Sequence, residues 1–300
     1  MNMNSSRIYR LLSVLSVTVA LVISSFSLSA QSQNFESRYN LLVSQLGPAG
    51  VGIETLLQKW EAADSTDKKM LLAKFDYYFT KSQSEQVVKK SQNKYLGMDP
   101  LLSLKDSTGT PVYYYKEVIF DDELFAKALK AADKVASFYP DDLEFRFLKA
   151  NALIAYEKES PDMATAYLLD LMSQDQSRTR PWNYEGVKQD KDFFPDSMQE
   201  YCRTFYTVGG EPAMDTFLSI SKRMNELYPD MTCFVSNIAT YYLVAKDDPK
   251  SALKYYGKVL KKVKDDEVAL RNACIAARKA GNRKLEQKYQ QMLRQYGYVK

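Results

Sequence analysis

The sequence contains no histidine among its 300 residues. Without imidazole, this chain cannot form a Ser-His-Asp triad, a Cys-His dyad, a zinc site with histidine ligands or a histidine pH switch. Chemistry by carboxylate, lysine, tyrosine or cysteine side chains stays open, and so does a function without catalysis. The composition therefore closes several common enzyme mechanisms before any motif is considered.

Cysteine is almost as scarce, because the chain has three: Cys202, Cys233 and Cys274. Three cysteines are too few for a disulfide scaffold, and an odd number leaves at least one unpaired within a monomer. We expect these cysteines to be small, buried packing residues. A disulfide bridge between Cys202 and Cys233 stays open as an alternative.

Neither sign of charge predominates, because 41 lysine and arginine residues face 37 aspartate and glutamate residues. A nearly neutral chain lacks the basic surface that nucleic acid binding requires, so no nucleic acid partner is expected. The hydrophobic share of 45% and the charged share of 26% are those of a folded soluble protein. Lysine runs such as Lys89-Lys90 and Lys261-Lys262 are interpreted as solvated helix faces.

The first 30 residues have the features of a secretory signal peptide. Arg7 and Arg10 provide the positive start, Leu11 to Phe26 is apolar apart from serine and threonine, and small residues precede a cleavage site after Ala30. An uncleaved membrane anchor is the alternative, but the apolar stretch is marginal for the roughly 20 residues that a spanning helix needs. We therefore predict a periplasmic or secreted protein with no stable membrane insertion after cleavage.

Beyond this leader the sequence is expected to be mostly helical. Residues 35–91 show helical periodicity, with Asp64 or Ser65 capping the second of two helices. Residues 101–120 instead predict a β-hairpin, because a β-branched and aromatic run follows a turn sequence rich in polar residues and glycine. The predicted organisation is a signal peptide at 1–30, an N-terminal helical region with a β-hairpin at 31–120, and a helical repeat region at 121–300.

Paired aspartates recur along the chain, at Asp121-Asp122, Asp141-Asp142, Asp247-Asp248 and Asp265-Asp266. Paired carboxylates serve glycoside hydrolysis in some proteins and cation binding in others. Each of these pairs, however, stands where a helix begins, and aspartate there accepts hydrogen bonds from free backbone N–H groups. We interpret them as helix caps. The sequence also lacks the motifs of a calcium loop and of a phosphate-binding glycine loop, so no metal or cofactor is expected.

The strongest pattern is an internal repeat. Tyr139-Pro140-Asp141-Asp142 returns as Tyr228-Pro229-Asp230-Met231 about 90 residues later, and a Pro-x-x-Ala sequence typical of a helix start follows each copy. In the C-terminal third, Ala239 and Tyr256 recur as Cys274 and Tyr289, at a spacing of about 34 residues. That spacing is the length of one helix–turn–helix repeat.

On these positions, the segment from about 125 to 296 resembles the tetratricopeptide repeat (TPR) family. The resemblance implies an all-α solenoid of stacked helix–turn–helix pairs, interrupted by the small β-hairpin around 101–120, in which the first helix of each pair lines a concave groove. By position in the repeat, this groove would contain Asn237, Thr240, Tyr241, Arg271, Asn272 and Arg278. Asparagine and arginine are suited to holding a peptide backbone or carboxylate there, whereas a plain solvated helix face is the alternative.

The predicted function is a non-catalytic scaffold or assembly factor of the bacterial periplasm or envelope, which binds a protein or peptide segment on its concave face. The alternative is a carbohydrate-binding or carbohydrate-processing envelope protein. The stretch at 177–195 has no clear period and carries enough aromatic residues to pack on the helices. Within it, Trp182 and Tyr184 would stack on sugar rings if they are exposed.

Overall fold

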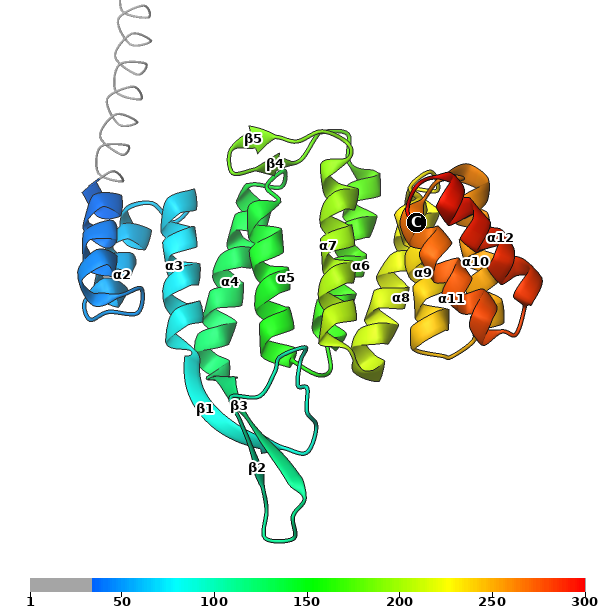
Figure 1. The fold of residues 1–300 in the computed structure, drawn as a ribbon. Coiled ribbons are helices and arrows are strands. Elements are labelled where there is room, and N and C mark those ends of the chain that lie inside the picture. The colour runs from blue at the N-terminus through cyan, green and yellow to red at the C-terminus, as the bar shows by residue number, and fades with distance from the viewer. Residues whose placement is uncertain (1–33, 300) are drawn as a thin grey trace, which may run out of the picture. The chain divides into compact units, whose positions relative to one another are not determined.

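A computed structural model describes residues 34–299, which are mainly helical (Figure 1). The predicted leader at 1–30 lies outside the described residues. The chain divides into two compact units, of which the first comprises residues 34–85 and 118–145 and the second comprises 86–117 and 146–299. The predicted boundary at residue 120 does not coincide with this division. Among the described helices, we find none with the length and apolar character that spanning a bilayer requires.

The first unit contains a helical stretch at 34–46 and three further helices, α2 (Ile53–Ala63), α3 (Lys68–Lys81) and α4 (Asp122–Phe138). Helix α3 packs between α2 and α4. The buried core residues follow the helical period, so that each helix turns one apolar face inward. They include Leu56, Leu57 and Trp60 of α2, Met70, Leu71 and Phe75 of α3, and Ala128, Ala132 and Val135 of α4.

The cap of α3 differs from the prediction. Asp67, and neither Asp64 nor Ser65, accepts hydrogen bonds from the backbone N–H groups of Lys69 and Met70. Asp64 instead accepts from the backbone N–H of Thr66 at 2.9 Å and thereby closes the turn ahead of the helix. Asp67 also accepts a hydrogen bond of 3.0 Å from the indole N–H of the buried Trp60, so the cap ties α2 to α3.

A three-stranded sheet has the order β1-β3-β2, with β1 at Gln83–Lys90, β2 at Leu102–Lys105 and β3 at Pro111–Phe120. The predicted hairpin is confirmed, because β2 and β3 pair antiparallel with Leu102 opposite Tyr114. The helical prediction was wrong for 83–90, which includes Lys89-Lys90. Helix α3 ends at Lys81, and the following residues extend because pairing with β3 satisfies their backbone.

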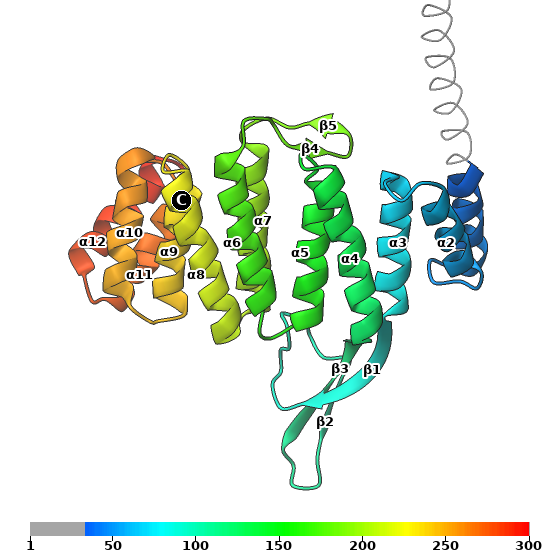
Figure 2. The ribbon, with the colours of Figure 1, turned by 180° about the vertical axis from the view of Figure 1, so that it is seen from behind.

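Most of the second unit is helical, and the consecutive helices from α7 to α12 pack on one another (Figure 2). The helices are α5 (Glu144–Glu157), α6 (Asp162–Ser177), α7 (Phe193–Val208), α8 (Gly210–Leu227), α9 (Thr232–Val244), α10 (Pro249–Lys262), α11 (Glu267–Lys279) and α12 (Arg283–Gln295). In the C-terminal part, buried small residues such as Ala239, Ala252 and Ala273 alternate with the large side chains of Tyr256 and Leu270. Small residues allow the helix backbones to approach closely.

The capping interpretation of the aspartates is confirmed for one member of each pair. Asp121 accepts from Leu124 N at 2.9 Å, and Asp142 accepts from Phe145 N at 3.4 Å. The same bond joins Asp248 to Ser251 N at 3.0 Å and Asp266 to Ala269 N at 2.8 Å. These carboxylates are therefore used to satisfy backbone groups that a helix start leaves without a partner.

The stretch at 177–195 packs on the helices, as predicted, and contains a small antiparallel ladder of β4 (Asn183–Tyr184) and β5 (Val187–Lys188). Trp182 is only 5% exposed, which contradicts its expected role as an exposed sugar-stacking residue. Its indole N–H donates to Asp175 Oδ1 at 2.8 Å, and its ring stacks on Phe194. The guanidinium of Arg178 lies 3.5 Å from the centroid of the ring, close enough for a cation–π interaction.

Candidate functional site

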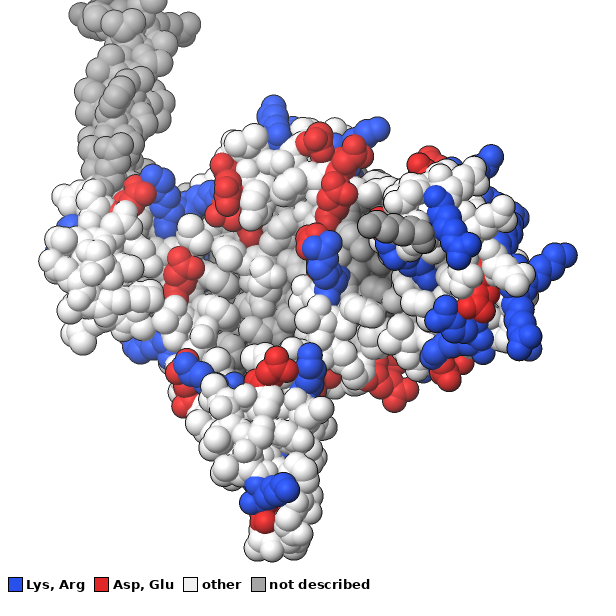
Figure 3. Space-filling model, in the orientation of Figure 1, with Lys and Arg blue, Asp and Glu red and all other residues white. Residues whose placement is uncertain are grey.

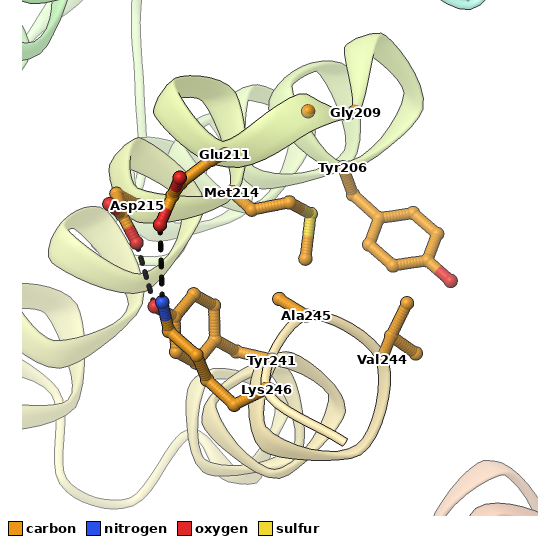
Figure 4. A pocket seen from close by; sticks show the side chains of 10 residues that line it. Tyr206, Gly209, Glu211, Met214, Asp215, Tyr241, Val244, Ala245 and Lys246 are labelled. Atoms are coloured by element: carbon orange, nitrogen blue, oxygen red, sulfur yellow. Dashed lines mark hydrogen bonds and ion pairs between the residues drawn. The ribbon is translucent and has the colours of Figure 1, made fainter.

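A pocket of about 570 Å³ lies within the second unit, where the end of α7, the start of α8 and the end of α9 meet (Figure 4). The turn between α7 and α8 shapes it. Gly209 and Gly210 both have positive φ angles, 69° and 76°, in the region that favours glycine. This turn directs the first turns of α8 toward α9. The lining residues are Tyr206, Gly209, Gly210, Glu211, Met214, Asp215, Tyr241, Val244, Ala245 and Lys246.

One side of the pocket is apolar and open to solvent. Tyr206 is 43% exposed and Val244 is 56% exposed, although both are large hydrophobic side chains. Met214 and Ala245 face Tyr206 and Val244 in Figure 4, so the four side chains surround one open space. Single exposed hydrophobic residues are ordinary, but a group of them around a concavity is typical of a binding site.

The other side of the pocket is polar and held together by hydrogen bonds and charge. The hydroxyl of Tyr241 donates to Asp215 Oδ1 at 2.7 Å, and Lys246 Nζ lies 3.6 Å from Glu211 Oε1 (Figure 4). Burial and the bond to Asp215 raise the pKa of Tyr241. A hydrogen bond with Tyr241 raises the pKa of Lys246. At neutral pH the phenol is therefore protonated and can donate a hydrogen bond, and the amine is charged.

Among the predicted groove residues, Thr240 and Asn272 are brought together by the buried Tyr256. The hydroxyl oxygens of Thr240 and Tyr256 are 2.9 Å apart. Burial raises the pKa of Tyr256, while hydrogen bonds with Thr240 and Asn272 act in the opposite direction. These two side chains thus join α9, α10 and α11 to one another.

Asn237 makes a different connection. It exchanges two side-chain hydrogen bonds with Gln199 of α7, at 2.8 Å and 3.3 Å. Its amide therefore links α9 to α7. Tyr241, one turn further along α9, is the predicted residue that the structure places in the pocket.

The two predicted arginines form their hydrogen bonds outside this pocket, with residues of α11, of α12 and of the segment that follows α12. Arg271 donates to Glu267 Oε1 at 2.7 Å and to the carbonyl oxygen of Tyr298 at 2.8 Å. Arg278 donates to Glu286 Oε1 of α12 at 2.7 Å. Figure 3 shows basic side chains gathered over this C-terminal end of the second unit. The structure does not bring either arginine together with Tyr241, because the pocket is lined by α7, α8 and α9.

The pocket also contains residues that the sequence did not single out, chiefly Tyr206, Glu211, Asp215 and Lys246. The Gly-Gly turn at 209–210 was the one visible signal, because two adjacent glycines between helices mark a change of chain direction. Nothing local in the sequence indicates that Tyr206 and Val244 are left uncovered.

A second concavity, of about 360 Å³, lies between α5 and α7 and contains the predicted Tyr184. The Tyr184 ring lies 6.1 Å from Phe147 and 5.2 Å from Phe193, centroid to centroid. The polar lining of this concavity comes from Asn151, Ser197, Glu200 and Thr204. Of the two predicted stacking residues, Tyr184 is thus half-buried at a concave surface, while Trp182 is enclosed.

The three cysteines are free, so the alternative of a Cys202–Cys233 bridge is not realised. Burial raises the pKa of the Cys202 thiol to about 12, so this thiol stays protonated at neutral pH. Its sulfur lies 3.5 Å from the hydroxyl of the buried Ser221. Within residues 34–299, no three acidic or cysteine side chains are grouped as metal ligands would be.

Comparison with known protein families gives no match for this chain, and no curated protein is significantly similar to it. The functional interpretation therefore depends on the residues and their geometry.

Proposed function

We propose that this protein is a non-catalytic interaction scaffold of the bacterial periplasm or envelope, built as a TPR-like solenoid. In a solenoid each helix contacts its neighbours in the chain and also the equivalent helix of the next pair. Contacts of α6 with α8, of α7 with α9 and of α9 with α11 support this arrangement for the second unit. The proposed location in the periplasm or envelope depends on the predicted signal peptide, with cleavage after Ala30.

The observation that carries the proposal is the pocket at the α7–α8 turn. It combines uncovered apolar side chains, Tyr206 and Val244, with polar groups that are already held in place by Tyr241–Asp215 and Lys246–Glu211 contacts. A partner segment would place an apolar side chain against the first group and bind the second with its polar atoms. Preorganised polar groups lose little freedom on binding, which favours affinity.

Site-specific photo-crosslinking in the native host tests this proposal. A photoreactive residue at Val244 is expected to capture one defined segment of a partner protein, identified by mass spectrometry. Met163 on α6 is a matched control, since it is 46% exposed and lies outside the pocket. Equal yields of the same product from both positions, or no product from Val244, would contradict the proposal.

Carbohydrate processing is the second candidate, and one observation favours it: Glu211 and Asp215 are two carboxylates in one pocket. Glycosidases need two such groups on opposite sides of the scissile bond. These two, however, lie one turn apart on the same helix, and each has a protein partner, Lys246 for Glu211 and Tyr241 for Asp215. Both belong to one wall of the pocket, which favours binding. Glycoside hydrolysis that is lost on Glu211→Gln substitution would support the second candidate.

A further inference from the structure

A basic pocket of about 360 Å³ lies in the first unit and takes no part in the proposed scaffold function. Helices α2, α3 and α4 supply its walls. Seven residues line it: Glu61 from α2, Lys74 and Tyr78 from α3, and Lys127, Lys130, Ala131 and Lys134 from α4. Four of the seven are lysines, although the chain as a whole is nearly neutral.

The lysines converge because of helix geometry. Lys127, Lys130 and Lys134 are spaced by three and four residues, which places them on one side of α4. The neighbouring side of this helix is buried, with Ala128 and Val135 in the core. Helix α3 packs against α4 and adds Lys74 to the same cavity.

Glu61 is the one carboxylate in the lining, and it binds two of the four lysines. Its Oε1 accepts from Lys134 at 2.8 Å, and its Oε2 accepts from Lys74. Burial opposes the ionised form, yet the hydrogen bonds from Lys134 and Lys74 outweigh it and hold the pKa of Glu61 below its usual value. The carboxylate stays charged at neutral pH and fixes these two ammonium groups at the cavity.

Lys127 and Lys130 have no carboxylate partner among the described residues. Both are exposed at the cavity, and Lys127 Nζ lies 5.5 Å from the centroid of the Tyr78 ring. Four ammonium groups against one carboxylate leave about three uncompensated positive charges. Like charges spaced three and four residues apart destabilise a helix, so an anion at this place would relieve the repulsion.

We propose that this pocket binds a small phosphate-bearing ligand. A lysine ammonium is a compact point charge that binds phosphate well, and a phosphate group brings up to about two negative charges at one centre. The cavity volume is at the lower end of the range for ligand sites, which suits a phosphate or pyrophosphate group with a small organic part. Tyr78 and Ala131 provide the apolar wall against which that part would lie.

Calorimetric titration of the full mature protein with inorganic pyrophosphate tests the proposal. We expect saturable binding to one site at low ionic strength, weaker at about 0.15 M salt, where the Debye length falls to about 8 Å. The double variant Lys127→Gln with Lys130→Gln is expected to bind about tenfold more weakly, since two charged donors are removed. The control is the double variant Lys59→Gln with Lys69→Gln. It removes the same number of positive charges, but from exposed lysines of the same unit that lie outside the pocket. It should bind pyrophosphate like the unchanged protein.

Absence of saturable binding overturns the proposal, as does an equal loss of affinity in both double variants. Tighter binding of citrate than of pyrophosphate overturns the assignment to phosphate. Circular dichroism verifies that the variants fold. If the double variant does not fold, the single variant Lys130→Gln takes its place.

Vesicles of phosphatidylcholine with and without phosphatidic acid distinguish the source of the phosphate. Co-sedimentation that needs phosphatidic acid and is lost in the Lys127/Lys130 variant indicates a lipid headgroup, and pyrophosphate binding without co-sedimentation indicates a soluble ligand.

Discussion

Asp76 on α3 carries a carboxyl group whose surroundings favour the neutral form. Burial raises its pKa to about 6, with a smaller contribution from the negative charge of Glu144. Because its pKa is higher in the folded than in the unfolded state, the folded protein binds more protons between about pH 4 and pH 6. The contribution of Asp76 to the stability of the folded protein therefore rises as the pH falls through that window. Above pH 6 the ionised carboxylate opposes folding.

Replacement of Asp76 by asparagine should remove this penalty. We expect Asp76→Asn to stabilise the protein by about 1 to 3 kcal/mol above pH 7 and to have little effect below about pH 4. Thermal unfolding of the variant and the unchanged protein at both pH values measures the difference. Asp99→Asn, at a carboxylate whose side chain is 84% exposed, is the control and should show no such pH dependence. A stability gain that is equal at both pH values would contradict the burial argument.

Tyr241 and Trp182 show what the sequence can indicate at the residue scale. Repeat position selected Tyr241, and it does line the pocket. Its partner Asp215 lies 26 residues earlier, so only the packing of α8 on α9 makes the pair. Trp182 stands in a stretch without a period, where nothing in the sequence reveals that Asp175 and Arg178 enclose its ring.

Helix starts are the element-scale feature that the sequence predicts best, because a cap depends on residues close in the chain. Asp121, Asp248 and Asp266 each accept a hydrogen bond from the backbone N–H three residues further on. The exception, Asp67 in place of Asp64 or Ser65, is a shift of a few residues at the same helix start.

The cap of α11 provides a quantitative test. Asp266→Ala removes the hydrogen bond to Ala269 N and is expected to lower the free energy of unfolding by about 1 kcal/mol. Asp265→Ala removes the same charge from the adjacent position, which is not the cap of this helix, and should change it by less than about 0.5 kcal/mol. Denaturant unfolding followed by circular dichroism gives both values. Equal losses from the two variants would mean that charge, and not the capping bond, is responsible.

Strand β1 shows why elements that depend on distant residues are harder to predict. The sequence of Gln83–Lys90 is largely polar and contains residues that are compatible with a helix, which led to the helical prediction. Pairing with β3, which follows more than 20 residues later, decides the outcome. In contrast, the β2–β3 hairpin was predicted, because its two strands are close in the chain. Asp106 closes its turn by accepting hydrogen bonds from the backbone N–H groups of Thr108 and Thr110.

At the scale of the whole molecule, the repeat spacing indicated helix pairs, and the consecutive helices from α7 to α12 pack on one another in the second unit. It did not indicate two compact units, because the first unit draws on residues 34–85 and on 118–145, which are separated in the chain. The pocket at Gly209-Gly210 also lay beyond prediction. It forms where three helix ends meet, and its open apolar side depends on which side chains the packing leaves uncovered.

The central claim is that a partner segment docks at the pocket between α7, α8 and α9. Hydrogen exchange measured by mass spectrometry, on the free protein and on its complex with the segment identified by crosslinking, tests this most directly. The account predicts slower exchange in the complex at residues 206–215 and 241–246, with α11 and α12 unchanged. Identical exchange at those two segments in both states, or protection confined to α11 and α12, would contradict it.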